Sequence, residues 1–109
     1  MSLILILLST FPGCLKKEKL ETTVIKTPTI VCERCEETIK TAVYNLEGVK
    51  EVNVDLKSRT VEISYLPLQT NLETIETTIA RAGYDANAKK RDPDAYENLP
   101  DCCKHQRQD

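Results

Sequence analysis

The spacing of apolar residues changes its period along the chain, and the order of these changes is the strongest constraint on the fold. Two stretches carry apolar residues at helical spacing, so that each has one apolar face. Stretches in which polar and apolar residues alternate, as in half-buried strands, lie before, between and after them. The predicted strands are residues 21–27, 52–56, 61–65 and 84–88, and the predicted helices are residues 35–46 and 72–82.

This βαββαβ order predicts an α+β fold with a four-stranded antiparallel sheet and two helices on one face. It is the ferredoxin-like, split βαβ sandwich, because right-handed crossovers leave few other topologies. Gly48 and Gly83 are placed to end the two helices, and Asn71 to cap the second. The chain has 109 residues, 40% of them apolar and none of them Trp. It is therefore one small domain, too small for a large catalytic domain with a buried cofactor crevice.

The first thirteen residues carry no charge and are mostly apolar. The run is too short to cross a bilayer as a helix but has the length of a secretory signal segment. Gly13-Cys14 at its end resembles the lipobox of bacterial lipoproteins, in which Cys14 would carry the lipid. We therefore predict a signal peptide over 1–13, a tether over 14–20, and an exported protein that is periplasmic or anchored through Cys14. An ordinary signal peptide or N-terminal anchor with an incidental cysteine is the alternative.

Cys32-Glu33-Arg34-Cys35 lies where a loop enters the first predicted helix. Two thiols three residues apart at this position can converge on one ion, and the helix N-terminus favours their thiolate forms. Thiolates select soft ions such as copper(I), zinc and mercury(II). Two ligands leave coordination positions open for another protein's thiols. The alternative is that Cys32 and Cys35 form a structural disulfide or a redox pair.

The region 21–88 resembles the heavy-metal-associated domain family, which includes copper chaperones, domains of copper-exporting ATPases and the periplasmic mercury-binding protein. The family motif Gly-Met-x-Cys-x-x-Cys corresponds to residues 29–35, with Thr29 for the Gly and Ile30 for the Met. The resemblance implies that Ile30 packs under the metal loop and that Tyr84 lies beside it, as a neighbour of the metal ligands or simply as core. It also implies a metal-transporting membrane protein or another metal-binding domain as partner. We expect the metal-free chain to be a monomer.

The tail, residues 89–109, contains Cys102-Cys103-Lys104-His105. Asp92-Pro93 predicts the start of a short helix. Tyr96 and Leu99 would give this helix a small apolar contact through which it docks on the domain. The segment from Lys89 to Cys102 has thirteen residue steps, which span roughly 43 Å when extended. A sheet is only roughly 17–20 Å long, so the tail can return to the metal loop. A site of Cys32 and Cys35 with Cys102 and Cys103 is therefore allowed, and the tail would then act as a latch. A strained disulfide within the pair or a free tail with incidental thiols are alternatives, and His105 is either a solvated residue or a further ligand.

The remaining composition excludes other functions. Fifteen basic and seventeen acidic residues give a net charge of −2, so no basic surface for nucleic acid is expected. One histidine, near the chain end, excludes a Ser-His-Asp triad in the core, and three glycines do not provide a phosphate loop. We therefore expect no enzyme but an exported protein that captures a soft ion, copper(I) before mercury(II) or zinc, and transfers or sequesters it. The alternative is an extracytoplasmic thiol-disulfide redox protein that uses the same cysteines.

Overall fold

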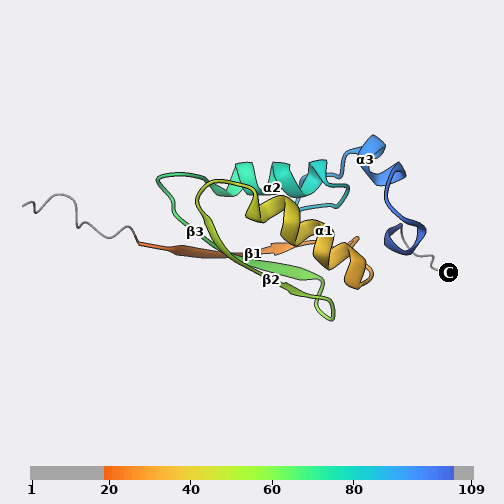
Figure 1. The fold of residues 1–109 in the computed structure, drawn as a ribbon, viewed down its shortest axis with the longest axis horizontal. Coiled ribbons are helices and arrows are strands. Elements are labelled where there is room, and N and C mark those ends of the chain that lie inside the picture. The colour runs from red at the N-terminus through yellow and green to blue at the C-terminus, as the bar shows by residue number, and fades with distance from the viewer. Residues whose placement is uncertain (1–18, 105–109) are drawn as a thin grey trace, which may run out of the picture.

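The computed structural model describes residues 19–104, in which two helices lie against one face of an antiparallel sheet (Figure 1). The predicted signal peptide, Cys14, most of the tether and His105 lie outside the described residues. None of the helices in the described part of the chain has the length and apolar character that a bilayer crossing requires. The elements are β1 (Glu21–Lys26), α1 (Glu33–Tyr44), β2 (Val49–Asp55), β3 (Thr60–Tyr65), α2 (Leu72–Arg81), α3 (Pro93–Glu97) and the 3₁₀ turn η2 (Asp101–Cys103).

The sheet has the strand order β1-β3-β2, and both strand pairs are antiparallel. Alternate side chains of the strands face the helices, as the sequence pattern indicates, except at the start of β2, where a bulge between Val49 and Glu51 interrupts the alternation. α1 and α2 place their apolar stripes on this face, so one core forms between the two layers. Its most deeply buried side chains include Ile25, Ile39, Val43, Val52, Val61, Ile63, Ile75 and Ile79.

The predicted fourth strand over 84–88 is wrong, because this segment makes a tight turn instead. Ala86 and Lys89 pair with each other across the turn, each donating its N–H to the other's carbonyl at 2.9 Å. Asn87 stands at its centre with φ of +55°, in the left-handed region that asparagine tolerates better than most residues. The Asn87 N–H donates to the Lys26 carbonyl at 2.8 Å, and the Asn87 Oδ1 accepts from the Lys26 N–H at 2.8 Å. The segment thus attaches to the edge of β1 at one residue and then turns away.

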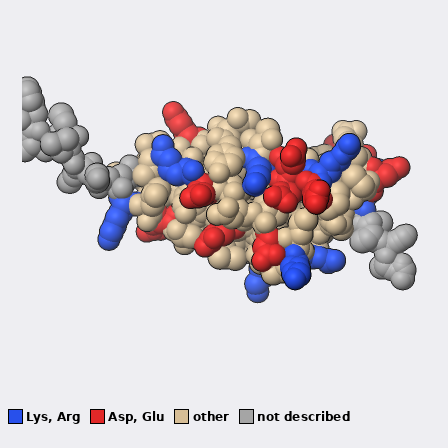
Figure 2. Space-filling model, turned by 60° about the horizontal axis from the view of Figure 1, so that its bottom comes forward, with Lys and Arg blue, Asp and Glu red and all other residues tan. Residues whose placement is uncertain are grey.

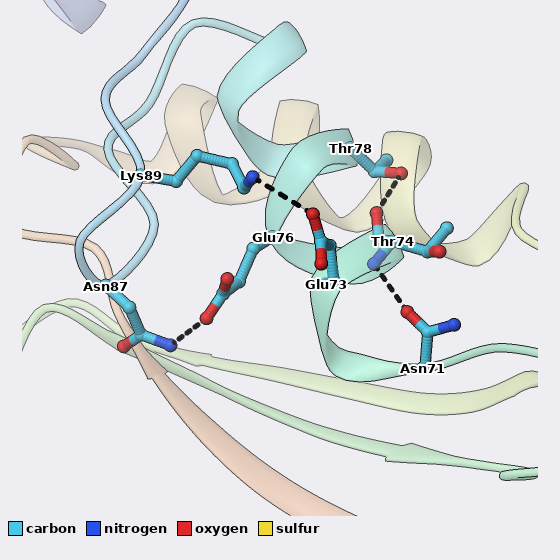
Figure 3. A network of polar contacts seen from close by, with 7 residues as sticks. All are labelled: Asn71, Glu73, Thr74, Glu76, Thr78, Asn87 and Lys89. Atoms are coloured by element: carbon cyan, nitrogen blue, oxygen red, sulfur yellow. Dashed lines mark hydrogen bonds and ion pairs between the residues drawn. The ribbon is translucent and has the colours of Figure 1, made fainter.

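Polar contacts tie this turn to α2 (Figure 3). The Asn87 amide donates to Glu76 Oε2 at 2.6 Å, and the Lys89 ammonium lies 3.7 Å from Glu73 Oε2. Both acidic residues project from α2. The chain that leaves the turn is therefore held beside the helix, and the tail starts from a defined place.

The predicted helix 72–82 agrees with α2 to within one residue, whereas the predicted helix 35–46 begins and ends two residues later than α1. The Asn71 Oδ1 accepts from the Thr74 N–H at 2.8 Å and caps α2 (Figure 3). Gly83 directly follows Ala82, the C-cap of α2, and ends this helix as predicted. Gly48 does not end α1, whose C-cap is Asn45, and lies instead in the turn directly before β2. Both glycines have positive φ, +98° at Gly48 and +108° at Gly83, a backbone conformation that residues with a Cβ rarely adopt.

Basic and acidic side chains are interspersed over the face of the molecule in Figure 2. This distribution agrees with the nearly balanced charge of the chain. The view shows no extended surface of one sign that would attract a nucleic-acid backbone.

Candidate metal centre

Cys32 and Cys35 lie at the start of α1, as the sequence predicts. Cys32 is the residue before the helix, with an extended backbone (φ −153°), and Cys35 is in the first turn, where its N–H donates to the Cys32 carbonyl at 3.0 Å. This local geometry turns both side chains to the same side. The two Sγ atoms are 3.5 Å apart.

The two thiols differ in their access to solvent. Cys35 is fully buried and belongs to the hydrophobic core, whereas Cys32 is partly exposed. Cys35 is therefore fixed by packing, and Cys32 is the member of the pair that another molecule can approach.

The tail returns to this loop, which confirms the predicted course of the chain. α3 begins as expected, with the Asp92 carboxylate accepting from the Ala95 N–H at 2.9 Å and Pro93 in the first helical position. After α3, η2 brings Cys103 Sγ to 3.7 Å from Cys32 Sγ. In Figure 1, this last turn lies at the same end of the molecule as the start of α1.

The bend of η2 allows both neighbouring tail thiols to face the loop. The sulfur atoms of Cys32, Cys102 and Cys103 all lie within 4.8 Å of one another. Cys103 is 1% exposed and packs in the core, whereas Cys102 is exposed. All four cysteines of the described chain are free thiols.

Packing at Gly83 explains how the tail is held. A Cβ atom at Gly83 would lie 3.0 Å from Leu99 Cδ1, so the absence of a side chain at this position lets Leu99 approach. The predicted docking role of Leu99 therefore has a structural basis. Tyr96 differs from the expectation, because its ring is covered by the Arg91 guanidinium at 3.7 Å from the ring centre.

Two polar links that the sequence analysis missed fix the beginning of the tail. Asp85 Oδ1 accepts from the Arg91 N–H at 2.9 Å, and the Asp85 N–H donates to Thr29 Oγ1 at 3.1 Å. Asp85 thus connects the tail to the loop that carries Cys32. The Asp-x-Asn sequence after Gly83-Tyr84 is a turn signal that could have replaced the strand prediction.

Ile30 and Tyr84 are both buried next to the cysteines. Ile30 is 1% exposed and belongs to the same core as Cys35. Tyr84 is fully buried, and its hydroxyl finds no hydrogen-bond partner among the described residues. Burial, followed by the neighbouring thiols of Cys35 and Cys103, raises the pKa of Tyr84, so this phenol stays protonated.

The thiols also differ in acidity. Partial burial raises the pKa of Cys32, but the Cys35 N–H and the thiols of Cys35, Cys102 and Cys103 together outweigh it and lower the pKa to about 7. Burial raises the pKa of Cys103, and the nearby Cys35 thiol adds to this effect. The contact with Cys32 raises the pKa of Cys102. The Cys32 thiolate is therefore available near neutral pH beside the protonated thiols of Cys102 and Cys103.

A surface hollow opens onto this cluster and gives an ion a path from solvent. Cys32 and Cys102 both line it, next to charged side chains of both signs. The lining residues are Cys32, Glu33, Arg34, Glu37, Leu56 and Cys102.

The sequence is similar to proteins of heavy-metal transport. It is 31% identical over 78 residues to a copper-exporting P-type ATPase of Staphylococcus haemolyticus, a match that covers 72% of this chain and 10% of the ATPase. It is 29% identical over 70 residues to the periplasmic component of the mercuric transport protein of Serratia marcescens, covering 64% of this chain and 77% of that protein. The chain thus spans a small part of the ATPase and most of the mercuric transport component.

Solved structures agree with these relatives. A putative copper-ion-binding protein from Bacillus anthracis superimposes with a TM-score of 0.62 at 28% identity, covering 65% of this chain and all of that one. Oxidized MerP from Ralstonia metallidurans superimposes with a TM-score of 0.61 at 26% identity, covering 66% of this chain and all of that one. The sequence profile of the heavy-metal-associated domain matches residues 24–85, more than half of the chain. The chain therefore belongs to the heavy-metal-associated domain family.

Proposed function

We propose that this protein captures a soft metal ion through Cys32 and Cys35 and then transfers or sequesters it. The observation that carries the proposal is the 3.5 Å separation of the two Sγ atoms where the loop enters α1. Sulfur ligands select copper(I), mercury(II) or zinc over hard cations such as magnesium. Among these ions we favour copper(I). The role is that of a carrier, with no catalytic step.

The unequal access to the two thiols supports transfer between proteins. An incoming thiolate can reach the ion from the hollow beside Cys32, while Cys35 is held in the core. The first relative described above is a copper-exporting ATPase and the second a mercuric transport component. We therefore propose as partner a metal-transporting membrane protein or another metal-binding domain, and a monomeric metal-free chain.

Removing both loop thiols tests the central role. We expect Cys32→Ser combined with Cys35→Ala to weaken copper(I) binding by more than about a hundredfold. Loss of a residue that only supports a metal ligand already lowers metal affinity about 10- to 100-fold, and this variant loses two ligands. Alanine is chosen at position 35 because this buried thiol behaves as a small apolar side chain. The measurement is competition with a chromophoric copper(I) chelator, under reducing and anaerobic conditions.

Glu37→Gln is the matched control, since Glu37 is exposed and lines the same hollow without a thiol. It should bind copper(I) as the parent does. Undiminished binding by the double cysteine variant would contradict the proposed function. A disulfide between Cys32 and Cys35 that cycles with a protein partner would favour the thiol-redox alternative.

We also propose that the chain is exported and anchored by a lipid on Cys14. The support is the uncharged apolar run of residues 1–13 followed by Gly13-Cys14. In a bacterial host that processes lipoproteins, the parent should fractionate with membranes. Cys14→Ser should move it to the soluble fraction or leave it unprocessed, and Ser9→Ala, within the apolar run, is the control. Equal membrane association of parent and Cys14→Ser would contradict lipid anchoring.

A further inference from the structure

The tail places more sulfur at the loop than a two-ligand carrier site needs. Cys32 lies 3.5 Å from Cys35 Sγ and 3.7 Å from Cys103 Sγ, and Cys102 is within 4.8 Å of both Cys32 and Cys103. Cys32 is thus close both to Cys35 in the loop and to Cys102 and Cys103 in the tail. These four thiols form what we term the thiol cluster.

The two shortest sulfur separations can be compared with those within metal–thiolate sites. With a metal–sulfur bond of about 2.3 Å, two sulfurs are about 4.6 Å apart in a linear site, about 4.0 Å in a trigonal site and about 3.8 Å in a tetrahedral site. The separations of 3.5 and 3.7 Å are close to the values for three or four ligands and well below the linear value. Cys32 therefore needs little movement to share one ion with Cys35 or with Cys103, and Cys102 lies within 4.8 Å of Cys32 and Cys103.

Apart from the buried Cys103, the tail is held in place by contacts that do not involve sulfur. Leu99 packs over Gly83, and the Asp92 N–H donates to the Ala80 carbonyl at 2.9 Å. The ion pair of Lys104 with Glu97, at 3.8 Å, lies within the tail itself and does not attach the tail to the rest of the domain. Cys103 adds its burial in the core. This is a small docking surface, and a small surface can open without unfolding the sheet and its helices.

We propose that Cys102 and Cys103 join Cys32 as ligands, so that the ion is held by at least three sulfurs and the tail acts as a latch. The inference rests on the proposed function and deepens it. With the tail docked, the third and fourth sulfurs occupy positions that an acceptor's thiols need, so the ion is retained. When Leu99 leaves Gly83, η2 withdraws its thiols, and Cys32 and Cys35 present the ion in a site open to transfer.

The coordination number tests the latch directly. The full chain carries Cys14→Ser throughout, so that Cys14 contributes no sulfur, and is loaded with one equivalent of copper(I) under anaerobic conditions. X-ray absorption should find three or more sulfur neighbours in this parent and two after Cys102→Ala and Cys103→Ala are added. Copper(I) retention against a chelator should fall at least about tenfold in that variant. Asp101→Ala, which leaves all thiols in place at an exposed neighbouring position, should match the parent.

Leu99→Asp separates docking from ligand chemistry, because it keeps every thiol and removes the apolar contact at Gly83. We expect it to lose copper(I) to an acceptor faster than the parent, as the Cys102 and Cys103 variant does. Circular dichroism should show the sheet and helices intact in both variants. Two sulfur neighbours in the parent, a second copper(I) held by the tail pair alone, or unchanged release by Leu99→Asp would each overturn the latch. Any of these results leaves the Cys32 and Cys35 experiment, and hence the proposed function, standing.

Discussion

Replacing Tyr84 with Ala should lower the free energy of unfolding by about 3–5 kcal/mol, the usual cost of removing a buried aromatic ring. The side chain is fully buried and is among the largest in the core, so its removal leaves a cavity beside Cys35 and Cys103. Tyr84→Phe should act in the opposite direction. It removes a buried hydroxyl whose polar neighbours among the described residues are the thiols of Cys35 and Cys103, which are weak hydrogen-bonding groups, and a gain of up to about 1 kcal/mol is expected.

Tyr44→Phe is the matched control, because the same atom is removed from a hydroxyl that is used. The Tyr44 hydroxyl accepts from the Val52 N–H at 3.0 Å, so its loss should cost about 1 kcal/mol. Urea unfolding of the metal-free chain at neutral pH measures all three variants. A destabilising Tyr84→Phe would show that the hydroxyl makes a stabilising polar contact, and that Tyr84 does more than fill space in the core.

The sequence predicted the elements whose signals are local. The apolar period from Cys35 to Leu46 located α1, although with both ends two residues too late, and the side chain of Asn71 capped α2 as expected. The cysteine loop was placed correctly because the start of the apolar period and the family motif agree on the same few residues. Local chemistry was enough in each of these cases.

The failed fourth strand shows where local patterns stop being informative. Tyr84, Ala86 and Ala88 alternate as in a strand, but Asn87 in the left-handed region breaks the ladder after one residue. Alternation over five residues does not reveal this turn, since the turn depends on the contacts of Asn87 with Lys26 and Glu76, which are distant in sequence. The return of the tail was foreseen from its length, but the link from Asp85 to Arg91 was not. That contact joins residues whose proximity only the turn creates.

Because the thiols differ in acidity, we expect large differences in their rates of alkylation. Cys32 should react with iodoacetamide in the metal-free chain with a half-maximal rate near pH 7, because its pKa is lowered from 9.0 to about 7. The reactive thiolate increases as pH rises, so the rate falls about tenfold for each pH unit below this value. At pH 6, the thiolate fraction exceeds that of an ordinary thiol about a hundredfold. A more acidic thiol is also a weaker nucleophile, which lowers the alkylation rate about tenfold. The net rate at pH 6 is therefore about tenfold higher than that of an ordinary thiol.

Cys102 provides the comparison within the same chain, because exposure and acidity rank the two thiols in opposite order. Cys102 is exposed and Cys32 only partly so, yet the pKa of Cys102 is raised by its contact with Cys32. If acidity governs the rate, Cys32 is labelled first at pH 6–7, Cys102 follows only at higher pH, and buried Cys103 is last. Peptide mapping by mass spectrometry after short labelling gives the order. Faster labelling of Cys102 at pH 6 would mean that access to solvent outweighs acidity, and that Cys32 is not the more reactive of these two thiols.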